Sequence, residues 1–138
     1  MKTIAITGGI GSGKSTLSKY LKKKGYFVHE SDKVVSRMYI SPNKKFINLI
    51  KESGLENAVK KNSIDKKIIA NKIFNEPRIK KKFEKYIHTH VFNERKNFIK
   101  QNIIAKKKFV FLDIPLLFEK KLDKSFDLIL CIISKKAT

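Results

Sequence analysis

The chain has 138 residues, which suits one domain with a real core but is short for an enzyme that binds two sizeable ligands. Its formal net charge is +20, and nearly all of its 32 basic residues are lysine. A dedicated nucleic-acid binder would use more arginine and would interleave aromatic side chains, so we do not expect nucleic acid as the main ligand. No apolar run approaches the length needed to span a membrane, and the first residues do not have the pattern of a signal peptide. We therefore expect no membrane partner and a cytoplasmic location.

The first elements are a short apolar segment and an amphipathic segment, with a glycine-rich loop between them. Residues 2–7 (KTIAIT) are mostly apolar and β-branched, which predicts a buried parallel strand. Within residues 15–24, Leu17, Tyr20 and Leu21 recur at helical spacing, and Gly25 is placed to end that helix. The order strand, loop, helix is therefore expected at the N-terminus.

The loop itself, GGIGSGKST, has the spacing G-x-x-x-x-G-K-[ST]. Glycines allow successive backbone N–H groups to converge on phosphate oxygens, while a lysine adds a mobile ammonium and a hydroxyl can bind Mg²⁺. A glycine-rich turn without a ligand is the alternative, which the strand and helix on either side disfavour. We predict a phosphate-binding loop made of Gly8, Gly11, Ser12, Gly13, Lys14, Ser15 and Thr16.

A second strand is expected at residues 26–29, and lysine-rich helical pattern then fills residues 43–108. Gly54 is placed to end the first of these helices, Asp65 to cap the second and Pro77 to begin the third. Their apolar positions are Phe46, Leu49 and Ile50, then Ile68, Ile69 and Ile73, and finally Ile79, Phe83, Tyr86, Ile87, Val91 and Phe98. We interpret the aromatic residues among them as packing positions.

Strand character returns at residues 109–113 and 128–133, so two carboxylates follow expected strands. Asp32 comes after the second strand and Asp113 ends the third, which places both at the carboxyl edge of a parallel sheet. Asp113 can hold magnesium, and Asp32 can orient or deprotonate an attacking hydroxyl. Either residue can instead be a loop residue or a helix cap. Cys131, which has no second cysteine to pair with, is expected to be a small buried hydrophobe in a reducing compartment.

Four strands alternating with helices predict an α/β fold, a P-loop NTPase-type three-layer parallel sheet with an inserted helical lobe. We expect a single domain over residues 1–138. Residues 1–42 and 109–138 would form its nucleotide-binding core, and residues 43–108 would form the inserted substrate lobe. The sequence does not indicate an oligomeric state.

Four motifs in order resemble the dephospho-CoA kinase family over nearly the whole chain. They are TGGIGSGKST, the E-S-D of residues 30–32, I-F-N-E-P at residues 73–77 with His88 eleven residues on, and D-I-P-L-L-F-E at residues 113–119. The resemblance implies transfer of the ATP γ-phosphoryl group to the ribose 3′-hydroxyl of dephospho-CoA, which completes coenzyme A synthesis. ATP would be the co-substrate, with Mg²⁺ held at Ser15 and Asp113. Asp32 and Lys14 would be catalytic, and the loop would bind the ATP phosphates.

The sequence also departs from the family pattern. Glu30 replaces the first Asp of the post-strand motif, Lys66 stands where arginine is common, and Thr89 replaces the proline after His88, which we expect to be a structural residue at a helix end. Family members continue past the fourth strand into an arginine-bearing lid and a fifth strand, so we expect the last strand and lid to be missing here. Two alternatives stay open: a catalytically weak ATP-binding module and a lysine-rich polyanion binder.

Overall fold

The computed structural model describes residues 1–9, 13–61, 63–114 and 126–133. They form two compact units. The first, which we call the sheet unit, comprises Met1–Asp32 and Asn93–Thr138, and the second, which we call the lobe, comprises Lys33–Phe92. No helix among the described residues is long and apolar enough to cross a membrane.

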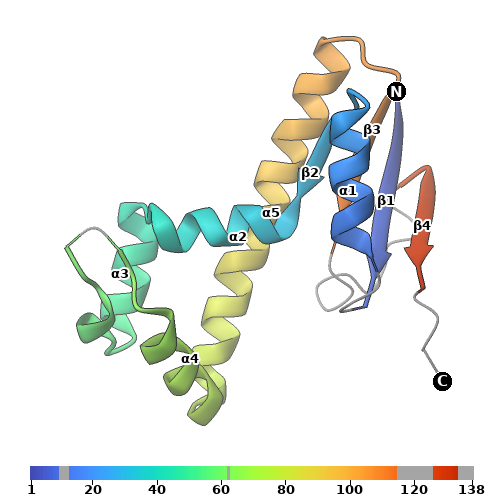
Figure 1. Ribbon diagram of the computed structural model, residues 1–138. Coiled ribbons are helices and arrows are strands. Elements are labelled where there is room, and N and C mark those ends of the chain that lie inside the picture. The colour runs from blue at the N-terminus through green and yellow to red at the C-terminus, as the bar shows by residue number, and fades with distance from the viewer. Residues whose placement is uncertain (10–12, 62, 115–125, 134–138) are drawn as a thin grey trace, which may run out of the picture. The chain divides into compact units, whose positions relative to one another are not determined.

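Four parallel strands make up the sheet of the sheet unit (Figure 1). They are β1 (Lys2–Gly8), β2 (Val28–Glu30), β3 (Phe109–Asp113) and β4 (Leu128–Ile132), in the order β2-β3-β1-β4. In the pairing register, Asp113 lies opposite Ile6 on one side and opposite Glu30 on the other. The carboxyl ends of β1, β2 and β3 therefore meet at one edge, as the sequence predicts.

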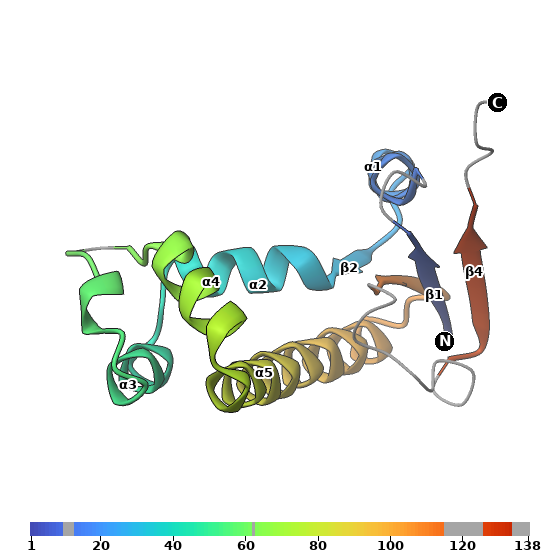
Figure 2. The same ribbon diagram turned by 90° about the horizontal axis from the view of Figure 1, so that it is seen from below.

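Helices cover both faces of this sheet. Helix α1 (Lys14–Lys23) lies on one face, and the C-terminal part of α5 (Pro77–Ile104) lies on the other (Figure 2). The cluster on the α1 side contains Ile6, Leu21 and Phe111, and the cluster on the α5 side contains Ala5, Leu112 and Ile114. Alternate residues of β1 and β3 face opposite sides, so each strand contributes to both clusters. The three-layer α/β architecture is confirmed.

The lobe is built from helices around a separate apolar core. Its elements are α2 (Ser31–Ile40), whose first two residues belong to the sheet unit, α3 (Lys44–Glu52), the short 3₁₀ helix η1 (Glu56–Ala58), α4 (Lys66–Asn75) and the first part of α5. The core residues are Met38, Phe46, Ile50, Leu55, Ala58, Ile64, Ile69 and Phe83. The ring of Phe46 stacks on Tyr86 at 5.5 Å between centroids and meets Tyr39 edge-on at 5.3 Å. The interpretation of Phe46, Phe83 and Tyr86 as packing residues is confirmed.

The local helix signals predicted from the sequence are present. The Asp65 carboxylate accepts a hydrogen bond from the Lys67 backbone N–H at 3.0 Å, which caps α4. Gly25 and Gly54 follow α1 and α3 with φ of +92° and +78°, a conformation that residues with a Cβ rarely adopt. The predicted ends of these helices therefore hold to within one or two residues.

The compact units divide at residues 32 and 92: Met38 of α2 belongs to the lobe core, and Phe98 of α5 packs on the sheet. Two details differ from the sequence-based expectation. No helix was predicted over residues 31–40, although Val34 and Met38 are buried at i,i+4 spacing on α2. The second strand occupies Val28–Glu30, two residues later than its predicted start.

Two side-chain predictions are wrong. Cys131 is exposed rather than buried, because β4 lies at an edge of the sheet and none of its five residues is fully buried. His88 lies in the interior of α5 rather than at a helix end. Thr89, which replaces the expected proline, keeps its backbone N–H and donates its hydroxyl to the Lys85 carbonyl at 2.9 Å, so the helix continues.

Candidate functional site

The predicted phosphate loop begins where β1 ends and finishes where α1 begins. Gly8 is buried as the last residue of β1, and Gly13 is the residue before α1, with φ of +90°. This left-handed conformation requires glycine in practice, which explains the residue directly before the lysine. Gly11 and Ser12 lie outside the described residues.

The first turn of α1 carries three polar residues of the motif: Lys14, Ser15 and Thr16. Gly13 has no side chain with which to cap the helix, and no acidic residue stands in this turn. The positive end of the helix dipole is therefore not neutralised by its own sequence, an arrangement that favours an anion. Ser15 and Thr16 are exposed.

The structure brings Lys14 and Asp113 into direct contact. The Lys14 Nζ lies 2.9 Å from Asp113 Oδ1, and the two side chains are only 13% and 9% exposed. The second carboxylate oxygen, Oδ2, accepts a hydrogen bond from Ser18 Oγ at 3.0 Å. Because a buried charge is tolerated only when it is paired, this ion pair holds the lysine at the carboxyl end of β3.

The oxygen ligands at this edge fit a magnesium ion that a bound nucleotide would share. Mg²⁺ prefers hard oxygen donors and is usually bound through one or two carboxylates together with substrate phosphates. Asp113 supplies a carboxylate here, and Ser15 supplies an exposed hydroxyl in the adjoining turn. Among the described residues, no group of three or more His, Cys, Asp or Glu is arranged to hold a metal by itself.

Asp32 belongs to the same edge but not to the ion-paired cluster. It is exposed in the first turn of α2, two residues beyond the end of β2. Since β2 pairs with β3, the chain leaves the sheet at Asp32 on the same side as at Asp113. No hydrogen bond or ion pair joins Asp32 to Lys14 or Asp113, all three of which lie in the described part of the chain.

Further groups near this edge were not predicted from the sequence. Ser18 is buried beneath Asp113, and Lys22 of α1 forms an ion pair with Glu30 at the end of β2. Arg95 is buried on α5, with its Nη2 3.5 Å from Ser31 Oγ. Lys14, Ser18 and Lys22 are spaced four residues apart, so they lie on one face of α1. This spacing is the sequence signal that could have indicated Ser18 and Lys22.

Two groups with shifted pKa values lie away from this edge. The pKa of the Asp127 carboxyl is lowered, chiefly because it accepts a hydrogen bond from the Thr3 backbone N–H and a second from the Thr3 hydroxyl. In the lobe, burial raises the pKa of Tyr39. Neither group belongs to the predicted site.

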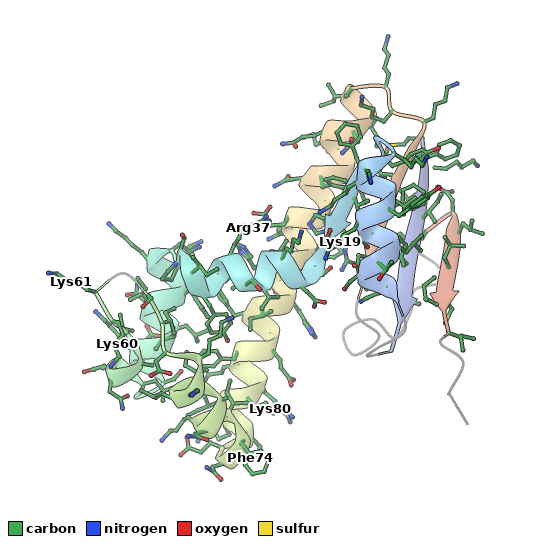
Figure 3. All side chains as sticks on the ribbon, viewed as in Figure 1. Lys19, Arg37, Lys60, Lys61, Phe74 and Lys80 are labelled. Carbon is green, nitrogen blue, oxygen red and sulfur yellow. The ribbon has the colours of Figure 1, made fainter. Side chains whose placement is uncertain are left out.

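The lobe surface has a hollow of about 560 Å³. It is lined by Tyr39, Lys66, Ile69, Ala70, Ile73, Phe74 and Lys80. Phe74 and Lys80 are labelled in Figure 3, where the Phe74 side chain points outward, in keeping with its exposure of 87%. The ammonium of Lys66 lies over the Tyr39 ring, 5.1 Å from its centroid. The hollow thus combines an apolar lining with two lysines.

Comparison with known proteins decides the family. The family described as CoaE, dephospho-CoA kinase, matches residues 2–138. The chain belongs to the dephospho-CoA kinase family. Among similar proteins named dephospho-CoA kinase, the one from Fusobacterium nucleatum is 36% identical over 133 residues (95% of this chain), and the one from Buchnera aphidicola is 38% identical over 130 residues (94%).

Two solved structures are similar to this chain over most of its length, and one of them is named dephospho-CoA kinase. The crystal structure of TT1252 from Thermus thermophilus matches with a TM-score of 0.72 at 31% identity, over 96% of this chain and 65% of that one. The dephospho-CoA kinase from Campylobacter jejuni matches with a TM-score of 0.71 at 26% identity, over 86% and 59%. The chain spans 66% of the Fusobacterium protein and 60% of the Buchnera protein.

Proposed function

We propose that the chain carries the nucleotide and acceptor sites of an ATP-dependent dephospho-CoA kinase. The observation that carries the proposal is the contact between Lys14 and Asp113 at the carboxyl edge of the sheet, in a member of that family. In this proposal the phosphate loop, from Gly8 to Thr16, binds ATP, and the lobe receives dephospho-CoA in the cytoplasm.

The proposed reaction uses the residues of this edge in separate roles. Lys14 exchanges Asp113 for the outer phosphates of ATP, where its charge offsets negative charge on the transferring group. Asp32 orients the ribose 3′-hydroxyl of dephospho-CoA and accepts its proton. The freed oxygen bonds to the γ-phosphorus while the bond from that phosphorus to the β–γ bridging oxygen breaks, and ADP leaves. Magnesium at Ser15 and Asp113 would neutralise phosphate charge.

The charge of the whole chain and the surface of the lobe support the proposed role of the lobe as the acceptor site. The whole chain carries a formal charge of +20, which favours the approach of two polyanionic ligands. The hollow that contains Lys66 and Lys80 offers an apolar lining beside two ammonium groups. Dephospho-CoA has the matching chemistry, since it joins a pyrophosphate to a less polar pantetheine arm.

The proposal is tested with a coupled assay for ADP formation, using ATP, Mg²⁺ and dephospho-CoA. In Asp32→Asn we expect turnover to fall by about 10² to 10⁴-fold, the usual contribution of a positioned general base. ATP binding, measured by calorimetry, should change little because Asp32 acts on the acceptor. Glu52→Gln, which changes an exposed acid on α3, is the matched control and should leave both quantities unchanged.

Two outcomes would count against the proposal. Full turnover in Asp32→Asn would remove Asp32 from the reaction. ATP binding by the wild-type chain without any transfer to dephospho-CoA would favour the ATP-binding module instead.

A further inference from the structure

Ser18 is a buried hydroxyl that lies outside the phosphate-loop motif. It is on the second turn of α1, and its side chain is 1% exposed. Its Oγ donates to Asp113 Oδ2 at 3.0 Å, across 95 residues of sequence. A buried hydroxyl usually needs a partner, and a hydrogen bond to an ionised carboxylate is stronger than one between two neutral groups.

The two oxygens of Asp113 have different partners. Oδ1 faces Lys14 at 2.9 Å, while Oδ2 accepts from Ser18. If Lys14 moves to the phosphates of a nucleotide, Oδ1 becomes available and Ser18 still holds Oδ2. The hydrogen bond then fixes the rotation of the carboxylate, as partners of ligating carboxylates do in metal sites.

We propose that Ser18 is a positioning residue for magnesium: it holds the Asp113 carboxylate with Oδ1 directed toward the nucleotide-bound ion. This inference rests on the proposed function, because it requires a nucleotide to take Lys14 away from Asp113. It adds a residue that none of the four family motifs contains.

A purely structural role for Ser18 makes a different prediction. A hydrogen bond that only joins α1 to β3 would affect unfolding, and it would leave the affinity for metal unchanged in the folded protein. The affinity of the nucleotide complex for metal therefore separates the two roles, and it can be measured without turnover.

The experiment titrates Mn²⁺, followed by electron paramagnetic resonance, into the chain saturated with a non-hydrolysable ATP analogue. We expect Ser18→Ala to weaken Mn²⁺ binding by about 10-fold or more, the usual effect of removing a partner of a ligating group. Affinity for the analogue in the absence of metal should be unchanged. Thr3→Val is the matched control, since it removes a hydroxyl that donates to Asp127 in the same unit, and it should not alter Mn²⁺ affinity.

A double-mutant comparison tests whether Ser18 acts through Asp113. In an Asp113→Asn background, Ser18→Ala should cause no further loss of Mn²⁺ affinity. If Ser18→Ala fails to fold, Ser18→Cys serves the same test, because it is close in size and its thiol is a weak donor.

The failures are distinguishable. Wild-type Mn²⁺ affinity in a folded Ser18→Ala complex would overturn the inference while leaving the proposed function intact. A wild-type chain that binds no analogue at all would overturn the proposed function and the inference with it.

Discussion

The sheet unit and the lobe differ most in what they bury. The buried polar or charged residues among the described ones are Thr7, Ser18, His29, Ser31, Arg95, Asn102 and Asp113. All of them belong to the sheet unit. The described part of the lobe buries only apolar side chains, centred on Phe46 and Phe83.

This difference separates chemistry from packing. Burying a polar group is costly unless it is paired, so a core without such groups is the simpler way to stabilise a fold. The sheet unit buries polar groups where Lys14 and Ser18 contact Asp113 at the carboxyl ends of the strands. We therefore expect substitutions in the sheet unit to change binding and turnover, and core substitutions in the lobe to change stability.

The largest effect is expected from Lys14→Ala. It removes the ammonium that should contact the outer ATP phosphates, so we expect transfer to dephospho-CoA to fall by at least about 100-fold, as when one transition-state donor is lost. It also leaves the Asp113 charge without its ion-pair partner, which should lower the melting temperature. The coupled assay and a thermal melt measure the two effects.

Lys19→Ala is the control for this experiment. Lys19 is an exposed lysine on the same helix, labelled in Figure 3. Its loss should leave turnover within the error of the assay. Normal turnover in Lys14→Ala would contradict the assignment of chemistry to this edge.

The next largest effect is expected in the lobe. Phe46 is buried against Tyr39, Phe83 and Tyr86, so Phe46→Ala should lower the free energy of unfolding by about 3–5 kcal/mol through the cavity it leaves. Hydrogen exchange with mass spectrometry should show the loss of protection concentrated in residues 33–92. Equal loss in β1 and β3 would mean that the two cores unfold as one.

Phe74→Ala is the matched control, because it also removes a phenylalanine ring from the lobe. Phe74 is 87% exposed, so its truncation should change the free energy of unfolding by no more than about 0.5 kcal/mol. A large effect would show that Phe74 is covered in solution.

Local signals explain why much of the fold was predictable. The strand at Phe109–Asp113 matches its predicted range because four consecutive apolar residues are followed by an acid. The cap at Asp65 and the left-handed glycines after α1 and α3 depend only on neighbouring residues. Helix α2 was missed because its buried apolar residues, Val34 and Met38, are too few to give a clear helical period.

The candidate site was less predictable because its contacts are not local. The sequence indicated Lys14 and Asp113 separately, but their ion pair depends on the pairing of β1 with β3. The hydrogen bond from Ser18 to Asp113 depends in addition on how α1 packs on the sheet. The exposure of Cys131 likewise follows from the strand order, which places β4 at an edge. Sequence spacing places Lys14 and Ser18 on one face of α1, but it does not indicate that this face meets Asp113.

The smallest effect is expected at Asp127, which lies in the sheet unit near the start of β1 and β4. The carboxylate of Asp127 accepts from the Thr3 backbone N–H at 2.8 Å and from its hydroxyl at 3.1 Å, which lowers the pKa of Asp127 in the folded state. A lowered folded pKa stabilises the fold above the ordinary aspartate pKa, and this contribution is lost as the pH falls through the folded value. Asp127→Asn should therefore be slightly less stable than wild type in urea at neutral pH, and the difference should vanish at the lowest pH where both remain folded. A stability difference that does not change with pH would show that Asp127 acts through packing rather than charge. This part of the sheet unit would then be stabilised by packing, as the core of the lobe is.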